Sequence, residues 1–574
     1  MHTHHRAGAV LLTLVLAACS SVDREPAAAK EPAPPPATGQ ALPKAADAAG
    51  NLATQRLAPQ GGLAELAYAP APCCWLPPAE DRENYAHEAE NPVHLAGEQP
   101  VSTFSIDVDT ASYANVRRFL NDGQLPPEHA VRVEELVNYF PYTYPVPATR
   151  DRPFSITTAL APAPWDARKV LLQVALKGYE VPAAKRAPAN LVFLVDVSGS
   201  MQDPAKLPLL KSAFRLMTSQ LKATDRVALV VYAGAAGTVL EPTPGDQQAK
   251  IRAALDRLEA GGSTNGGEGI RLAYDLAREG FIRGGINRIV LATDGDFNVG
   301  TTDFDALIDL VEREREDGVS LTTLGFGTGN YNDQLVERLA DAGNGNHAYI
   351  DTLAEGRKVL VEQLTGTLQT IAKDVKVQVE FNPAEVAEYR LIGYENRALD
   401  REDFNNDRVD AGEIGAGHTV TALYELTLEG SAARLVDPLR YGARPPPRDP
   451  APGGGELAYV RLRYKVPEGD TSRLIEQPVQ RAALRPLGAA PELRFAAAVA
   501  AFGQKLRGSD YLGSYSWADI AALAAGARGD DPEGYRGEFV SLVRLADTIE
   551  MADGRPGTPT PSPGPAPEAA RLRH

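Results

Sequence analysis

From Leu191 onwards, short apolar runs alternate with stretches in which apolar residues recur at helical spacing. Residues 191–195 are continuously apolar, as strands buried on both faces of a parallel sheet are. The next stretch predicts a helix with one apolar stripe, formed by Leu207, Leu210, Phe214, Met217 and Leu221. This alternation predicts an α/β domain with a mostly parallel sheet. Its further strands are expected at 226–232, 288–293, 320–326 and 347–350, and its helices near 247–258, 266–280, 303–317, 331–340 and 353–372.

Strand-like runs also occur on both sides of this domain. Two precede it, at 154–160 and 169–176, and three follow it, at 375–381, 420–428 and 457–464. We expect these runs to pair into an antiparallel β unit into which the α/β domain is inserted. A small helical module is predicted after them, at 492–506, 517–527 and 537–549. Its stripe of Phe495, Val499 and Phe502 is interpreted as core packing.

The first 19 residues form a short apolar run behind basic and histidine residues, and end in Leu16-Ala17-Ala18-Cys19. The run is too short for a permanent membrane helix and is typical of a signal peptide. Its end resembles a bacterial lipoprotein box, which implies that Cys19 is acylated and anchors the chain in the cell envelope. With Ser20 next, the resemblance implies the outer membrane if the cell is Gram-negative. The alternative is an ordinary signal peptide cut after small residues.

Composition adds two expectations. Residues 20–85 and 553–574 are rich in Ala, Pro and Gly, which predicts a disordered tether and tail. The tether holds Cys73 and Cys74, whose state is left open. The chain carries 58 Lys and Arg against 75 Asp and Glu, hence a net charge of 58 − 75 = −17. Nucleic acid is therefore not an expected partner, since its binding depends on neutralising phosphates.

Three predicted turns of the α/β domain contain oxygen-bearing side chains. Asp196, Ser198 and Ser200 follow the first strand, Thr264 lies in a Gly-rich loop before a helix, and Asp294 follows a later strand. Because ligands bind at the carboxyl ends of strands in such sheets, we expect these side chains to meet there. Hard oxygen donors suit Mg²⁺, Mn²⁺ or Ca²⁺. Alternatively, these residues only cap helices and turns.

The Asp-x-Ser-x-Ser, Thr and Asp pattern resembles the metal-ion-dependent adhesion site of the von Willebrand factor A family. The resemblance implies that the five residues hold Mg²⁺ for binding, not for catalysis, and that a protein partner supplies an acidic side chain to the ion. Ser263 could substitute for Thr264, although the family's usual run favours Thr264. A scaffold with a purely structural ion is the alternative function.

Residues 101–145 and 374–550 resemble the flanks of bacterial lipoproteins that pair an A domain with a trailing domain of unknown function. The expected organisation is a signal peptide, tether, N-terminal segment, first β strands, A domain, β-rich unit, helical module and tail. Their expected bounds are 1–19, 20–85, 86–150, 151–185, 186–373, 374–480, 481–552 and 553–574.

Two further motifs in the sequence resemble known functional sites. Asp107 and Asp109 resemble the start of haloacid-dehalogenase phosphatases, but Thr110 falls one place early and the preceding run 101–105 is partly polar. We therefore expect Asp109 to precede a helix as a turn or cap residue, and the protein not to be an enzyme. The second motif, Asp403–Glu413, has the alternating oxygens of a calcium loop. Arg408 replaces the turn glycine and the final Glu is one place short, which favours a solvated acidic turn.

Overall fold

The computed structural model describes residues 82–149, 151–263, 265–295, 304–437, 455–467, 469–552 and 554. Cys19, Cys73, Cys74, the predicted signal peptide and all of the predicted tether up to residue 81 lie outside this range. Within the described ranges, no helix combines the length and the apolar character that a bilayer crossing needs.

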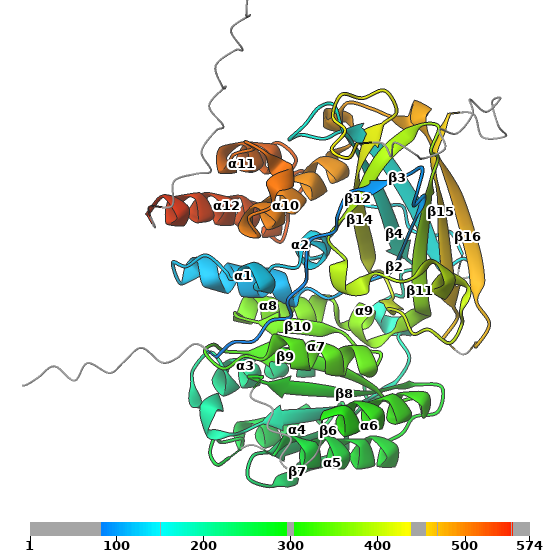
Figure 1. The fold of residues 1–574 in the computed structure, drawn as a ribbon. Helices are drawn as coiled ribbons and strands as arrows, with labels where there is room; N and C mark the ends of the chain where they lie inside the picture. The colour runs from blue at the N-terminus through cyan, green and yellow to red at the C-terminus, as the bar shows by residue number, and fades with distance from the viewer. Residues whose placement is uncertain are drawn as a thin grey trace, which may run out of the picture. The chain divides into compact units, whose positions relative to one another are not determined.

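The inserted α/β domain is built on a six-stranded sheet in the order β10-β9-β8-β5-β6-β7 (Figure 1). Neighbouring strands are parallel except β6 and β7, which are antiparallel. Strand β5 lies between β8 and β6 and is buried along its whole length, as its apolar run predicted. The strands are β5 (Ala189–Asp196), β6 (Arg226–Tyr232), β7 (Ala236–Pro244), β8 (Ile286–Thr293), β9 (Ser320–Phe326) and β10 (His347–Ile350). The edge strand β7 was not predicted, because most of its residues are only partly buried or exposed and their polarity is mixed.

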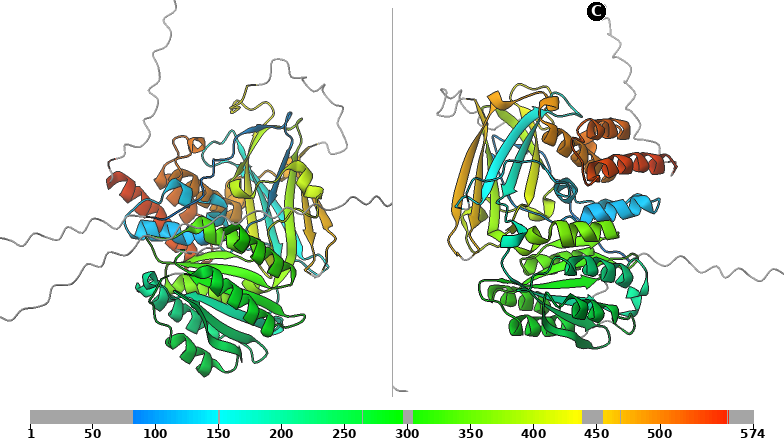
Figure 2. Two further views of the ribbon diagram at one scale, coloured as in Figure 1. Left: turned by 60° about the horizontal axis from the view of Figure 1, so that its bottom comes forward. Right: turned by 180° about the vertical axis from the view of Figure 1, so that it is seen from behind.

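Helices cover both faces of this sheet (Figure 1, Figure 2). Helices α3 (Leu207–Thr218) and α4 (Gln248–Asp256) share a core with one face. Helices α5 (Gly266–Glu279), α6 (Phe304–Glu316) and α7 (Asp333–Ala342) share a second core with the other face. The predicted apolar stripe of α3 is buried throughout. The α/β fold class inferred from the sequence is therefore confirmed.

The helix predicted over 353–372 is interrupted, and the prediction is wrong at its end, from residue 370 onwards. The segment consists of α8 (Leu353–Arg357), a π-helical turn (Lys358–Glu362) and α9 (Leu364–Leu368), and strand β11 then begins at Thr370. Thr370 and Ala372 pair with the short strand β13 (Ile414–Gly415). This pairing joins residues more than forty positions apart, which local periodicity does not report.

The flanking strands form two sheets that share one hydrophobic core. One sheet has the order β1-β12-β14-β4-β3, and the other the order β13-β11-β15-β16 with β2 added on β11. Strand β4, before the inserted domain, pairs antiparallel with β14, after it, so the predicted insertion is confirmed. The remaining bounds are β1 (His94–Leu95), β2 (Val101–Ser105), β3 (Phe154–Pro162), β4 (Val170–Gly178), β11 (Thr370–Phe381), β12 (Val386–Ile392), β14 (Thr419–Leu428), β15 (Glu456–Lys465) and β16 (Arg473–Gln480).

Helices from both ends of the described chain share a third core. Helices α1 (Ala111–Asn121) and α2 (Val133–Asn138) join α10 (Pro491–Leu506), α11 (Trp517–Ala525) and α12 (Tyr535–Ala552). Phe495, Val499 and Phe502 are fully buried in it, as their stripe predicted. The N-terminal segment therefore completes the helical module, a relation that the sequence did not reveal.

A buried arginine of α1 links this helical core to the inserted domain. The Arg117 guanidinium lies 2.5 Å from Asp351 and 2.7 Å from Glu355, both of which follow β10. It also lies 3.2 Å from Glu538 of α12. The side chains of Arg117, Asp351 and Glu355 are at most 5% exposed. Such charges are tolerated in the interior only because they are paired.

We expect Arg117→Leu to lower the free energy of unfolding by about 3–5 kcal/mol, because it leaves buried carboxylates without their counter-charge. Chemical denaturation of the purified chain measures this change. Arg168→Leu is the control, since Arg168 pairs with Asp166 in an exposed position and should matter little. Similar small losses in both variants would contradict the buried role of Arg117.

Candidate metal centre

The ends of two adjacent strands place the two aspartates of the predicted site at one edge of the sheet. Asp196 is the last residue of β5, and Asp294 directly follows β8, the parallel neighbour of β5. Neither residue has measurable exposure to solvent. The sheet order therefore brings together two carboxylates that are nearly a hundred residues apart.

Hydrogen bonds fix both oxygens of Asp196. Its Oδ1 accepts from the backbone N–H of Ser198 at 2.8 Å. Its Oδ2 accepts from the hydroxyls of Tyr232 and Thr293, each at 3.2 Å. With these donors already in place, Asp196 is suited to hold a cation through water or to orient the hydroxyls beside it.

The two serines of the motif lie next to each other at the start of a short 3-10 helix, Gly199–Gln202. Their hydroxyl oxygens are 3.1 Å apart, with Ser198 buried and Ser200 exposed. A hydroxyl that donates to its neighbour keeps lone pairs that can face a cation. The pair thus lies where the buried carboxylates meet the surface.

The Gly-rich loop of Gly261 and Gly262 is docked against the loop that follows β5. The backbone N–H of Gly199 donates to the carbonyl of Gly262 at 3.1 Å, and Gly261 N–H donates to Val197 at 2.7 Å. Gly262 has φ of +90°, a conformation that favours glycine. Thr264 itself lies outside the described residues, but its loop meets the loop that carries Ser198 and Ser200.

A buried lysine, which the sequence analysis did not identify, contacts the site. Lys206 Nζ lies 2.9 Å from Asp294 Oδ2 and donates to Asn330 Oδ1 at 3.0 Å. Asn330 Nδ2 in turn donates to Asp294 at 3.2 Å. A Cβ at Gly327 would lie 2.2 Å from Lys206 Cε, so a side chain there would displace the lysine. No local pattern marks Lys206 as buried, because it precedes a helix between two prolines.

The electrostatics of the site favour a bound cation. Burial, together with the charge of Asp294, raises the pKa of Asp196 to about 6, although hydrogen bonds from Ser198 oppose the shift. The ionised form of Asp196 is therefore destabilised by its surroundings. With both aspartates ionised and Lys206 protonated, the charge is −2 + 1 = −1. Carboxylate and hydroxyl oxygens around a residual negative charge fit a hard divalent cation.

Asp107 and Asp109, the residues of the phosphatase hypothesis, are buried and engaged elsewhere. Asp109 Oδ1 accepts the backbone N–H of His347 in β10 at 2.8 Å, and Asp107 Oδ1 accepts the N–H of Asp109 at 2.9 Å. The Arg397 guanidinium approaches both carboxylates, at 3.5–3.6 Å. These contacts hold the N-terminal segment against the inserted domain, which does not favour a catalytic role.

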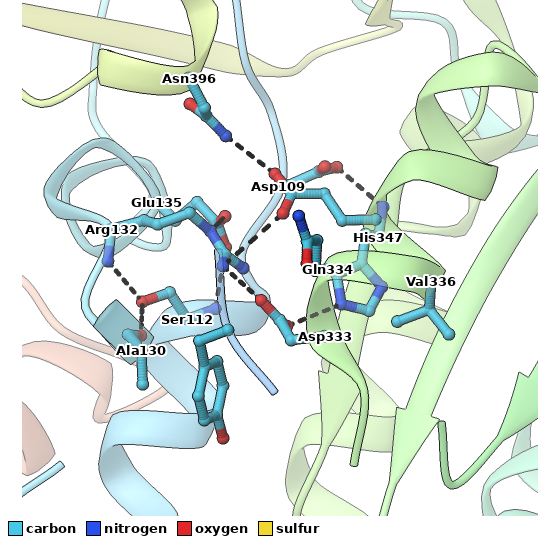
Figure 3. Close-up of polar contacts among 12 residues, drawn as sticks. Asp109, Ser112, Ala130, Arg132, Glu135, Asp333, Gln334, Val336, His347 and Asn396 are labelled. Carbon is cyan, nitrogen blue, oxygen red and sulfur yellow. Dashed lines mark hydrogen bonds and ion pairs between the residues drawn. The ribbon is translucent and has the colours of Figure 1, made fainter. Parts of the chain in front are cut away.

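Beside Asp109, a second set of buried charges crosses the same junction (Figure 3). Arg132, which directly precedes α2, forms ion pairs with Glu135 of α2 and with Asp333 of α7. His347 Nε2 lies 3.3 Å from Asp333 Oδ1. Asp333 is therefore held from two directions, and the network fixes α2 against α7.

Comparison with known proteins matches three family profiles to the chain. The profile described as "von Willebrand factor type A domain" matches residues 190–363. One described as "von Willebrand factor" matches residues 79–173, and one described as "Uncharacterized protein YfbK, C-terminal" matches residues 366–549. The resemblance of the central region to the von Willebrand factor A family, and the pairing of this domain with a trailing domain of uncharacterised function, are confirmed.

Relatives are similar over different lengths. The protein YfbK of Escherichia coli K12 is 50% identical over 475 residues, which cover 81% of each chain. The protein sll0103 of Synechocystis is 31% identical over 195 residues, which cover 34% of this chain and 45% of that protein. Among solved structures, a von Willebrand factor type A protein from Catenulispora acidiphila aligns with a TM-score of 0.38 at 17% identity, over 72% of this chain and 90% of that one.

The charge of Lys206 predicts a specific effect on metal affinity. Lys206→Met removes a positive charge beside Asp294 and should strengthen Mg²⁺ binding by about tenfold or more, because like charges only a few Å apart repel. Calorimetric titration measures this affinity. Lys211→Met is the control, since its ammonium donates to the carbonyls of Asp256 and Leu258 instead. An unchanged affinity in Lys206→Met would show that the ammonium leaves the site when the ion binds.

Proposed function

We propose, for a chain that belongs to the YfbK family of proteins with a von Willebrand factor A domain, a binding function that depends on Mg²⁺. Asp196, Ser198, Ser200, Thr264 and Asp294 hold the ion, with Mn²⁺ or Ca²⁺ as possible substitutes. The protein is anchored by lipid in the cell envelope and binds a protein partner there.

The observation that carries this proposal is the convergence of the motif residues. Asp196 and Asp294 end adjacent strands, the Ser198 and Ser200 hydroxyls lie beside Asp196, and the Gly262 loop bonds to the serine loop. Capping alone does not require that two distant segments bring oxygen donors to one edge and that the Gly262 loop bonds to one of them. Binding of a hard cation does.

The charge of the site indicates the chemistry of the partner. The two aspartates and Lys206 together carry a charge of −1. A bound divalent ion changes this charge to −1 + 2 = +1. A positively charged ion at the rim of the sheet attracts an oxygen anion. We therefore infer that the partner contributes an Asp or Glu carboxylate to the ion.

Asp294→Ala should abolish detectable Mg²⁺ binding at this site, because the ion loses a buried negative ligand. Calorimetric titration of the purified chain checks this, with Asp309→Ala on the exposed side of α6 as the matched control. Capture of partners from an envelope extract should fail for Asp294→Ala, and for the unaltered protein in EDTA.

Equal Mg²⁺ binding in Asp294→Ala and in the unaltered chain would remove the assigned site. If chelation lowers the melting temperature but partner capture persists, the scaffold function is favoured instead. In that case the ion stabilises the fold without contacting the partner.

The proposed anchor rests on Leu16-Ala17-Ala18-Cys19, which follows an apolar run too short to span a membrane. Cys19→Ser should prevent acylation and release the protein from the membrane fraction, which immunoblots of fractionated cells measure. Unchanged sedimentation with membranes would refute a lipid anchor at Cys19.

A further inference from the structure

Three carboxylates from two segments meet near the start of β11, away from the strand ends of the inserted domain. Asp374, Asp410 and Glu413 each contribute one oxygen, and these oxygens all lie within 4.8 Å of one another. Oxygens that surround a Ca²⁺ ion at about 2.3–2.6 Å are separated by distances up to about 5 Å. The cluster therefore already has the dimensions of a cation site.

The backbone holds these carboxylates in place. Strand β11 is irregular between Lys373 and Lys376, and Asp374 has φ of +51° there. The N–H of Val375 donates to Gly412 O at 3.0 Å, and that of Ala411 donates to Asp374 Oδ1 at 3.3 Å. A Cβ at Gly412 would lie 2.2 Å from the carbonyl oxygen of Ile106, so only glycine fits in this turn.

Two basic side chains neutralise the cluster in part. Lys465 Nζ lies 2.7 Å from Asp374 Oδ2, and Arg315 Nη1 lies 2.5 Å from Asp410 Oδ2. Three carboxylates and two cations leave a charge of −3 + 2 = −1. Each basic group contacts one oxygen of its carboxylate.

Glu413 carries the independent observation that points to a ligand. Its Oε1 is buried and has no hydrogen-bond partner among the described residues. A buried carboxylate oxygen without a partner destabilises the fold unless the group is protonated or a cation binds it. Burial, followed by the charges of Asp410 and Asp374, raises the pKa of Glu413 well above its usual range.

We propose that Asp374, Asp410 and Glu413 bind a second divalent cation, Ca²⁺. The three carboxylates come from a strand irregularity and a loop, and Ca²⁺ accepts such irregular oxygen sets more readily than Mg²⁺, which requires near-octahedral geometry. This site is independent of the one at Asp196 and Asp294.

The site differs from the calcium-loop pattern in the sequence. Lys376 Nζ donates to the carbonyls of Asp403 and Asn406, at 3.0 and 2.7 Å, so an ammonium group occupies the first half of that loop. Asp407 pairs with Arg463 at 3.0 Å. Only the end of the motif, Asp410 and Glu413, faces Asp374, a residue that the motif does not include.

The second ion would stabilise a junction. It connects β11 to the loop before β13, and that loop is paired through Asp410 with Arg315 of α6 in the inserted domain. Bound Ca²⁺ would therefore stabilise the contact between the inserted domain and the strand that follows it.

Glu413→Gln tests the proposal, because the amide keeps the size and shape of the side chain and removes the negative charge that the ion would neutralise. We expect Ca²⁺ at a hundredfold excess over Kd to raise the melting temperature of the unaltered chain by about 2–3 °C. Glu413→Gln should bind one ion fewer, or bind it at least about tenfold more weakly, in equilibrium dialysis. Glu402→Gln, an exposed position on the neighbouring 3-10 helix, is the matched control and should bind like the unaltered chain.

Asp294→Ala separates the two sites, since it should retain the ion at Glu413. Ca²⁺ binding by Glu413→Gln with the stoichiometry and affinity of the unaltered chain would overturn the proposal. So would a complete loss of Ca²⁺ binding in a folded Asp294→Ala chain. Melting in EDTA, equal for Glu413→Gln and the unaltered chain, shows that the variant is folded.

Discussion

The parallel pairing of β5 with β8 is the constraint on which the proposed metal centre depends. In this register Val195 lies opposite Ala292, so Asp196 and Asp294 emerge at the same edge. Both are completely buried, and the neighbouring residue Thr293 donates its hydroxyl hydrogen to Asp196. Two buried carboxylates at one edge repel each other. Hydroxyl donors to Asp196 and the ammonium of Lys206 beside Asp294 offset this repulsion. A divalent cation at the proposed site would reduce this repulsion further.

The inserted domain is held by paired charges as well as by the chain itself. Strands β4 and β14, on either side of the insertion, pair along their lengths. Arg117 then joins the helical core to Asp351 and Glu355, and Asp109 accepts the backbone N–H of His347. A network of charges buried at such a junction is favourable only if every charge has a partner. Removal of one charged side chain leaves its partner unpaired in the low-dielectric interior.

The two proposed cation sites differ in chemistry. The first combines two carboxylates with neutral hydroxyls and a nearby lysine, so few charges would surround an ion there and a partner's carboxylate could complete its coordination. The second is built from three carboxylates of this chain, with Lys465 and Arg315 at its margin. The first arrangement is suited to an exchangeable partner, and the second to a permanent structural ion.

The sequence alone determined the elements whose residues are near one another in the chain. Apolar runs marked β5 and β9, and helical spacing marked α3 and α10, because burial on one or both faces imposes a period on the residues themselves. The expectation that the Asp-x-Ser-x-Ser motif lies at the same edge as Asp294 also came from the sequence, because both follow predicted parallel strands, whose carboxyl ends share an edge.

Only the tertiary structure decided which distant groups share a site. Lys206 contacts Asp294 across 88 positions, and Asp374 meets Glu413 through a strand irregularity, while Lys376 occupies the loop whose sequence suggested calcium. The edge strands β7 and β16 and the start of β11 likewise depend on pairing with distant partners. Local patterns record how much of a side chain is buried; they do not record which charge or strand lies opposite it, because that depends on how the whole chain folds.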